Sequence, residues 1–457
     1  MKSAKFPYLL RIILSLALMA VLLAASGAGA QEPSHAPLLV LISVDGLRPD
    51  YVTAAGEHGA KILNLHRFLK EGTYAEGVEG VVPTVTYPSH TTVVTGVSPA
   101  KHGIYGNTVF DPLQKNAQGW YWYAEDIRVP TLWDSAAKAG RTTASVQWPV
   151  TVGAHITWNI PEFWRANTDE DAKLLRAVST PGLLNDIAKD ISAYPGGIDA
   201  SVEGDEQRTK YAQWILEKKH PALLTLHLIS LDHIQHDTGP FSSESIAILG
   251  RLDAAIGGVR ATAERVANGQ AYIAVVSDHG FAKFDQQLNL FPAFREAKLI
   301  TEDDKGKISD WRAIPWVQSA SAAIMLKDPA DGATRNQVRD LLAKLAQDPA
   351  NGIDRIFDTE ELRKRGGFPT AAFFVSPKVG WKMGTSLDGS VLSKVKPGGT
   401  HGELPDVPDL RAAFFLIGPG VPAGKKLGMI DMRDIAPTLA HRVGLSLPSA
   451  DGKNLLH

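Results

Sequence analysis

The sequence predicts an α/β fold, with a mostly parallel central sheet and helices on both of its faces. Three observations lead to this prediction. Short apolar runs recur along the chain, helical patterns lie between them, and the first run is apolar without interruption. An uninterrupted apolar run is typical of a strand buried on both faces of a parallel sheet. Strands that alternate with helices indicate a sheet that helices cover on each side.

The strands and helices are expected at definite places along the chain. The predicted strands are residues 37–44, 142–146, 222–229, 271–276, 320–326, 371–375 and 412–417. The clearest helical patterns cover residues 129–139, 246–267 and 335–346. The stretches 151–220 and 281–399 show less of this alternation, so we expect insertions there that form a smaller cap or rim. Residues 31–457 are otherwise predicted to be a single domain.

The composition excludes several classes of function. The 457 residues include 47 Lys and Arg against 49 Asp and Glu, with a formal net charge of −2. This balance provides no broad basic surface, so binding to a nucleic acid polymer is not expected. The chain has no cysteine. Disulfides, zinc–thiolate sites, iron–sulfur clusters and cysteine nucleophiles are therefore excluded, and any metal must be held by His, Asp and Glu.

The first 30 residues are typical of a secretory signal peptide. Lys2, Lys5 and Arg11 precede the apolar run 12–25, and small residues follow it up to Ala30. This pattern predicts cleavage after Ala30. A permanent membrane anchor is the alternative, but the run is shorter than the roughly 20 apolar residues that a spanning helix needs. We expect no membrane attachment after cleavage. Export without cysteine favours a bacterial periplasm or medium.

Acidic and imidazole side chains gather at the ends of the predicted strands or in adjacent turns: Asp45, Asp232, His236, Asp278, His279 and His401. Ligands of such sheets bind outside the carboxyl ends of the strands. Carboxylate oxygens and imidazole nitrogens are the zinc ligands that remain when cysteine is absent. Each residue alone is equally compatible with a helix cap, a turn or an ordinary histidine. Their recurrence at four separate points favours a metal site.

The segment 83–96 predicts a helix with Pro88 in its first turn. Thr86 would then lie beside the amino end of the helix, where free N–H groups and the helix dipole favour negative charge. A threonine hydroxyl becomes a useful nucleophile when a metal ion activates it. The alternative is that Thr86 only caps the helix.

Taken in order, these elements resemble the two-metal motifs of the alkaline phosphatase superfamily, most of all its nucleotide pyrophosphatase/phosphodiesterase branch. The matching elements are Asp45, Thr86 in TYPSH, Asn107 in HGIYGN, Asp232 with His236, Asp278 with His279 in SDHG, and His401 in THG. The resemblance runs from about Leu38 to Leu447. It implies an alkaline-phosphatase-like fold for the whole catalytic domain.

The resemblance also implies roles for these residues. Asp232, His236 and His401 would hold one zinc ion. The second zinc ion would be held by Asp45, Asp278 and His279. Thr86 would attack phosphorus to give a phospho-threonine intermediate, and Asn107 would stabilise the phosphoryl oxygens. The implied protein is a secreted zinc phosphodiesterase or nucleotide pyrophosphatase, whose partner is a small phosphate diester or nucleotide.

One element departs from the family pattern, because Tyr87-Pro88-Ser89 stands where the branch commonly has Phe-Pro-Asn. Tyr87 could still offer a ring face to a nucleobase, and Trp164 is a candidate for a second face. Simple packing is the alternative for both residues.

Neighbouring activities remain as alternatives. A sulfatase is disfavoured because no Arg follows Thr86 in the required setting. A phosphonate hydrolase of the phosphonoacetate type and a phosphomonoesterase share the threonine. The absence of a neighbouring Arg or Lys beside Thr86 and Asn107 in the sequence favours a singly charged diester over a monoester. A secreted protein that binds metal without turnover is disfavoured, since it would need neither Thr86 nor Asn107.

Overall fold

The computed structural model describes residues 36–115, 119–164, 168–192 and 199–456. The predicted signal peptide, residues 1–30, lies outside the described residues. Residues 37–457 form one compact unit. No helix within the described ranges combines the length and the apolar character needed to cross a membrane.

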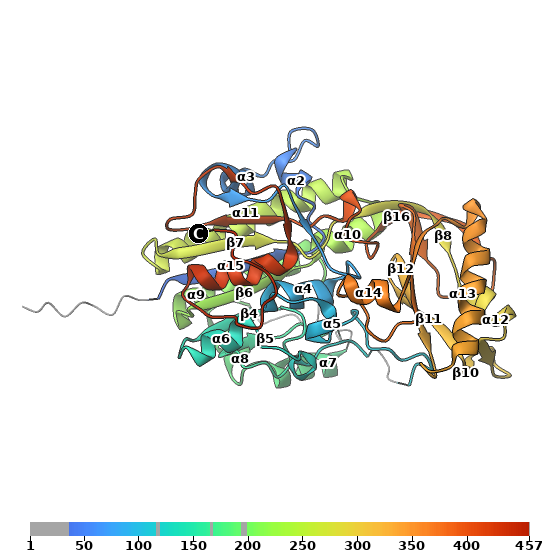
Figure 1. Ribbon diagram of the computed structural model, residues 1–457. Helices are drawn as coiled ribbons and strands as arrows, with labels where there is room; N and C mark the ends of the chain where they lie inside the picture. Colours follow the sequence, from blue (N-terminus) through green and yellow to red (C-terminus); the bar gives the residue numbers. More distant parts are fainter. Residues whose placement is uncertain (1–35, 116–118, 165–167, 193–198, 457) are drawn as a thin grey trace, which may run out of the picture. The chain divides into compact units, whose positions relative to one another are not determined.

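The central sheet has eight strands in the order β18-β2-β17-β7-β1-β6-β4-β5 (Figure 1). The strands from β7 to β5 all run parallel, whereas β17 runs antiparallel to β7 and to β2. Their bounds are Lys425–Lys426 (β18), Thr73–Tyr74 (β2), Phe414–Ile417 (β17), Ala271–Val276 (β7), Leu38–Val44 (β1), Leu223–Leu228 (β6), Thr143–Val146 (β4) and Trp158–Ile160 (β5). The predicted mostly parallel sheet is confirmed, with five of the seven predicted runs in it. The runs 320–326 and 371–375 instead form strands of a separate antiparallel sheet.

Helices cover both faces of this sheet. Alternate residues of β1 point to opposite sides, so Val40 and Ile42 enter one core and Leu39 and Leu41 the other. The first core is closed by α3 (Leu63–Glu71), α9 (Val202–Lys219) and α11 (Ser243–Val266). The second core is closed by α4 (Thr86–Thr95), α6 (Leu132–Lys138) and α15 (Ile435–Arg442). The continuous apolar run of β1 follows from this burial on both faces.

The remaining helices are shorter or lie outside these two layers. They are α2 (Asp50–Thr53), α5 (Pro99–His102), α7 (Asp169–Val178), α8 (Leu183–Asp190), α10 (Ser230–Thr238), α12 (Phe291–Glu296), α13 (Gly332–Gln347) and α14 (Thr359–Lys364). Of these, α10 follows directly from β6 and belongs to the site described below.

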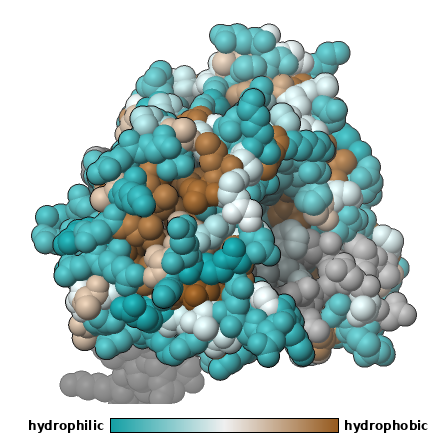
Figure 2. Space-filling model, turned by 90° about the vertical axis from the view of Figure 1, so that its right-hand side faces the viewer, coloured by the Kyte–Doolittle hydropathy of each residue, from teal (hydrophilic) through white to brown (hydrophobic). Residues whose placement is uncertain are grey.

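The stretch 281–399 builds its own sheets beside the central one (Figure 1). An antiparallel sheet has the order β11-β12-β14-β13, with bounds Ala313–Gln318, Ser321–Leu326, Phe373–Pro377 and Ile353–Asp358. A second sheet has the order β15-β8-β16, with bounds Gly380–Met383, Ala282–Leu288 and Leu392–Thr400. Outside this stretch, β3 (Gly77–Glu79) pairs with β19 (Met429–Asp431). Within it, a small pair of β9 (Ile300–Glu302) and β10 (Ile308–Trp311) completes the set of sheets. The side of the molecule that carries these sheets shows an apolar area within a mostly hydrophilic surface (Figure 2).

The stretch 151–220 differs from the expected cap or rim. It contributes β5 to the edge of the central sheet, and it contains α9, which packs on β6 and β4. The sequence gives little sign of this arrangement, because β5 is three residues long and its middle residue is the polar Asn159. A strand that short carries no detectable periodicity.

Candidate active site

The strand register places the acidic residues at one edge of the sheet. Ser43 of β1 pairs with His227 of β6 and with Val276 of β7. The three parallel strands therefore end together, and the segments that follow them meet. Gly46 makes the turn after β1 with φ of +69°, and a Cβ there would lie 2.9 Å from the ring of Phe281. Only glycine fits this turn, which directly follows Asp45.

All six predicted ligand residues lie together at this edge. Asp45 follows β1, Asp278 and His279 follow β7, Asp232 and His236 lie on α10, and His401 follows β16. His279 Nε2 is 3.4 Å from Asp45 Oδ1 and 3.1 Å from Asp278 Oδ2. Asp232 Oδ2 is 3.4 Å from His236 Nε2, and Asp232 Oδ1 is 3.6 Å from His401 Nε2.

Two groups of three are close enough to hold a metal ion, with all ligand atoms of each group within 4.8 Å of one another. One group is Asp45, Asp278 and His279, which is the set expected for the second ion. The other is Asp232, His401 and His279, whereas the resemblance implies His236 as the third member. His279 stacks on His401 at 3.6 Å between ring centroids, so it lies within reach of both groups. His236 is half-buried and forms the more exposed side of the cluster.

The three histidines are held by their other ring nitrogen. The Nδ1 atom of His236 hydrogen-bonds the carbonyl of Gly399, that of His279 the carbonyl of Gly280, and that of His401 the carbonyl of Thr84. A carbonyl accepts only, so each Nδ1 carries the proton and each Nε2 offers a lone pair. This is how protein scaffolds prepare histidine for a metal.

The cluster contains buried polar atoms that have no hydrogen-bond partner among the described residues. They are Asp45 Oδ1, Asp232 Oδ1, Asp278 Oδ2 and His279 Nε2. These oxygens of Asp45 and Asp278 face His279 Nε2, and Asp232 Oδ1 faces His401 Nε2. Orphaned buried polar atoms are rare and need an explanation, such as an ion. The donor set of carboxylate oxygens and imidazole nitrogens fits zinc or a similar divalent cation.

The electrostatics of the cluster lead to the same conclusion. Burial, reinforced by the charge of Asp232, raises the pKa of Asp45 well above its usual range. Burial and the charge of Asp45 raise the pKa of Asp278 in the same way. Burial and the neighbouring His401 lower the pKa of His279 well below its usual range, and burial lowers the pKa of His401 to about 4. Asp45 and Asp278 are thus disfavoured as anions unless a cation accompanies them, whereas the neighbouring His236 lowers the pKa of Asp232 against the opposing effect of burial.

Thr86 is the first residue of α4 and lies beside this cluster. The residue before it, the extended Val85, occupies the N-cap position, so the Thr86 hydroxyl is not the cap. Within the described residues this hydroxyl forms no hydrogen bond. His90, one turn along α4, hydrogen-bonds the carbonyl of Thr86 through Nδ1, and the same atom lies 3.6 Å from Asp278 Oδ2. The Thr86 hydroxyl therefore has no partner among the described residues, and it lies at a helix amino end that His90 links to the candidate ligand Asp278.

Asn107 is tied to the same helix end. The backbone N–H of Tyr87 donates to Asn107 Oδ1 at 2.9 Å. Because its oxygen is used, the side-chain amide presents its NH₂ group as the remaining donor. A donor fixed one residue from Thr86 suits an anionic oxygen bound at that position.

Residues 39–403 match the family described as type I phosphodiesterase / nucleotide pyrophosphatase. The chain belongs to this family. Human bis(5'-adenosyl)-triphosphatase ENPP4 is 25% identical over 253 residues, which are 55% of this chain and 49% of that protein. Human ectonucleotide pyrophosphatase/phosphodiesterase family member 1 is 29% identical over 231 residues, which are 48% of this chain and 21% of that protein. The chain thus spans about half or less of the length of these relatives.

Solved structures of the ectonucleotide phosphodiesterases share the fold. Human ENPP5 has a TM-score of 0.65 at 20% identity, covering 91% of this chain and 97% of that one. An inactive threonine-to-alanine variant of murine ENPP5 in complex with AMP has a TM-score of 0.66 at 19% identity, with the same coverage. These likenesses confirm the alkaline-phosphatase-like fold class predicted for this family member.

An aromatic wall borders the helix end of this phosphodiesterase-family chain. Trp120 and Trp164 stack with centroids 5.4 Å apart and planes 18° apart, and Tyr87 packs on Trp120 at 5.3 Å. Tyr87 is fully buried. Its ring therefore has no exposed face for a nucleobase, whereas Trp120 and Trp164 are only half-buried.

Two residues at the site were not identified from the sequence. His227 lies in β6 and places Nε2 3.1 Å from Asp45 Oδ2, and Glu162 Oε2 lies 2.6 Å from the other ring nitrogen of His227. Both are fully buried. In the sequence, Glu162 is only a charged residue in PEFW, and His227 is only a histidine within the apolar strand LLTLHL. Neither pattern is specific enough to predict a residue of the site.

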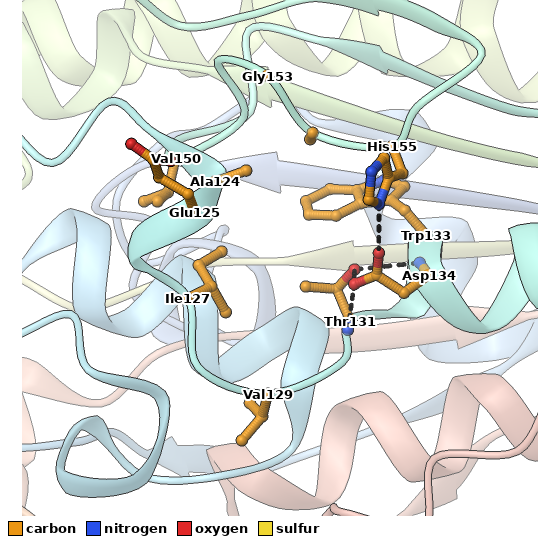
Figure 3. A pocket seen from close by; sticks show the side chains of 11 residues that line it. Ala124, Glu125, Ile127, Val129, Thr131, Trp133, Asp134, Val150, Gly153 and His155 are labelled. Atoms are coloured by element: carbon orange, nitrogen blue, oxygen red, sulfur yellow. Dashed lines mark hydrogen bonds and ion pairs between the residues drawn. The ribbon is translucent and has the colours of Figure 1, made fainter.

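A separate hollow of about 330 Å³ lies between the segment 124–134 and the segment 150–155 (Figure 3). None of the candidate site residues lines it. Its acidic residues are Glu125 and Asp134. Asp134 accepts from the backbone N–H of Thr131 and faces His155 at 3.6 Å. Because it contains none of the candidate ligands and lies apart from Thr86, the hollow is not the candidate active site.

Proposed function

We propose that this protein hydrolyses small phosphate diesters, including the pyrophosphate linkages of nucleotides, with Thr86 as nucleophile. The observation that carries the proposal is the free hydroxyl of Thr86 at the amino end of α4, beside the buried cluster of carboxylates and imidazoles. The names of two relatives support it: one is a bis(5'-adenosyl)-triphosphatase, and another is inactive as a threonine-to-alanine variant that binds AMP.

Two zinc ions would complete the site. Asp232, His236 and His401 would hold one, with His279 within reach of the same ion. Asp45 and Asp278, together with His279, would hold the other. When bound, zinc supplies Lewis-acid stabilisation of the negative charge around phosphorus.

The chain's own residues then perform the transfer. The Thr86 oxygen bonds to phosphorus as the bond to the leaving oxygen breaks. The phosphoryl group, with its other ester substituent still attached, passes to Thr86, and the leaving group departs with the proton of the Thr86 hydroxyl. The Asn107 amide donates to a phosphoryl oxygen, and the α4 amino end adds a favourable dipole. Water then cleaves the phospho-threonine and returns the proton to Thr86. His90 holds the Thr86 carbonyl and so fixes the first turn of the helix.

The charge around the nucleophile favours a diester. Within the described residues, the side chains that hydrogen-bond or ion-pair with Thr86, Asn107 and the six candidate ligands include no lysine or arginine. A dianionic monoester lacks a counter-charge there beyond the metals, whereas a singly charged diester needs none.

Two assays test the proposal. We expect Thr86→Ala to abolish turnover while zinc content stays at the wild-type level, and unchanged turnover would exclude Thr86 as nucleophile. We expect kcat/KM for bis-p-nitrophenyl phosphate to exceed that for p-nitrophenyl phosphate by a large factor with zinc present. A preference for the monoester would indicate a phosphatase instead, and activity on neither would lead to phosphonates.

We also propose that the protein is exported and cleaved after Ala30 into the bacterial periplasm or medium, because residues 1–30 have the charged, apolar and small-residue segments of a signal peptide. Amino-terminal sequencing of the exported protein tests this. A first residue other than Gln31 would contradict the proposed cleavage site.

A further inference from the structure

Asp45 divides its two carboxylate oxygens between different partners. Oδ1 faces His279 Nε2 at 3.4 Å and has no hydrogen bond within the described residues. Oδ2 accepts from His227 Nε2 at 3.1 Å. His227 thus occupies the oxygen that points away from the metal cluster and leaves the other oxygen available to an ion.

His227 is itself held by Glu162. Glu162 Oε2 lies 2.6 Å from His227 Nδ1, and the carbonyl of Gln147 lies 3.2 Å from the same atom. Glu162 Oε1 accepts from Trp164 Nε1 at 2.7 Å, so both of its oxygens have partners. His227 and Glu162 are fully buried. A buried carboxylate with this contact fixes the orientation of the imidazole, which in turn fixes the Asp45 carboxylate.

We propose that Glu162 and His227 are positioning residues that orient Asp45 as a ligand through one oxygen and thereby set the affinity of the second metal site. The inference rests on the proposed function, since Asp45 is a ligand only if the cluster binds metal. His227 contacts the candidate ligands through Asp45 Oδ2, and its ring also packs edge-on against His90 with centroids 4.3 Å apart. Glu162 reaches Asp45 through His227. The expected size of the effect is that of partners hydrogen-bonded to metal ligands, a loss of about 10- to 100-fold in metal affinity.

The test measures zinc affinity rather than turnover. Metal-free protein is titrated with zinc against a chromophoric chelator, and bound zinc is counted by mass spectrometry. We expect two tight equivalents in the wild type. In His227→Ala one equivalent should weaken about 10- to 100-fold while the other stays tight. His227→Gln should lose less, because its amide NH₂ can still donate to Asp45 Oδ2.

His102→Ala is the matched control. His102 is also a fully buried histidine, but its partners are the Thr92 hydroxyl and the Ile104 N–H, with no carboxylate among these contacts. We expect both zinc equivalents to keep wild-type affinity in His102→Ala. An equal loss in that variant would show that the effect is general loosening of the fold and would overturn the proposal.

Glu162→Gln addresses the case in which His227→Ala does not fold. Glutamine keeps the shape of the side chain but has only one oxygen to accept from the two donors, His227 and Trp164. One of the two zinc ions should therefore bind more weakly, and the rise in Tm on adding zinc should be smaller. Wild-type affinity in a folded Glu162→Gln or His227→Ala would overturn the inference and leave the proposed function standing. A wild-type protein that takes up no zinc would overturn both.

Discussion

Asp205 of α9 is expected to stabilise both the fold and the metal site. The carboxylate is fully buried and accepts from the N–H groups of Ile229 at 3.1 Å and Ser230 at 2.8 Å. It also pairs with the buried guanidinium of Arg208 at 2.5 Å. Ser230 begins α10, and Asp232 follows two residues later. One carboxylate therefore fixes the start of the helix that carries Asp232.

The magnitude follows from what Asp205→Ala removes. Deleting one partner of a buried ion pair costs about 3–5 kcal/mol, because the remaining charge stays in a region of low dielectric constant. Asp205→Ala also leaves two backbone N–H groups without an acceptor. Because these groups contact the same carboxylate, their cost is not simply added to the cost of breaking the ion pair. We expect Asp205→Ala to lower the free energy of unfolding by about 3–5 kcal/mol. Asp205→Asn should cost less, because its oxygen still accepts one N–H.

Urea unfolding of metal-free protein, followed by circular dichroism, measures this loss, and zinc titration measures the effect on the site. Asp253→Ala is the control. Asp253 accepts from the backbone N–H groups of Asn64 and Leu65 at the start of α3, a helix without site residues. Both variants should lose stability, but only Asp205→Ala should lose zinc affinity. A loss of less than about 1 kcal/mol in Asp205→Ala, or an equal fall in zinc affinity in Asp253→Ala, would refute this reasoning.

Three further predictions concern the site and its surroundings. Exhaustive chelation should abolish activity and zinc should restore it, and full activity without metal would exclude the mechanism. Zinc uptake should also release protons, because burial raises the pKa of Asp45. Calorimetry in buffers of different ionisation enthalpy measures the number of protons released. Asn107→Ala should lower kcat about 100- to 1000-fold, because this is the usual effect of losing one oxyanion donor. Asn107→Asp should be similarly slow, since a carboxylate does not donate. A wild-type kcat in Asn107→Ala would contradict the donor role. Burial lowers the pKa of His102 to about 3. The free energy of unfolding should therefore fall as pH drops below about 6.5, where the histidine of the unfolded chain takes up its proton, and continue to fall towards pH 3. Between pH 7 and pH 5, urea unfolding should show that His102→Gln loses about 2 kcal/mol less of this free energy than the wild type.

The central sheet could be predicted because its strands are apolar on both faces. Residues 271–276 form β7 as expected, and the run 37–44 becomes β1, Leu38–Val44. Such a run can be assigned to a strand without knowing its partner strands, because a strand buried on both faces is apolar at nearly every position. β5 could not be found in this way. It has three residues, and only its parallel pairing with β4 identifies it as a strand.

The candidate ligands could be predicted because most of them combine a polar side chain with a strand end, and Asp232 and His236 lie on the helix that follows β6. Asp45 and Asp278 directly follow apolar strands, and parallel strands bring such ends together. His227 carries no such signal, because a single histidine inside an apolar strand is equally typical of a satisfied core residue. Its partner Glu162 lies 65 residues earlier, and only the folded sheet brings the two together. The proposed positioning residues can therefore be identified only from the folded structure, whereas most of the candidate ligands can be predicted from their local sequence.

The same electrostatics indicate how the candidate metal site is tolerated in the fold without a metal ion. Burial raises the pKa of Asp45 and Asp278, which lets them hold protons, and lowers the pKa of His279 and His401, which keeps them uncharged. A cluster of several carboxylates at a buried edge would otherwise repel itself. Without a cation, the edge can approach neutrality by rearranging protons, at a cost below that of buried anions. Zinc would then replace these protons, so the preorganised Nε2 atoms and orphaned oxygens define a site that the fold builds and the metal completes.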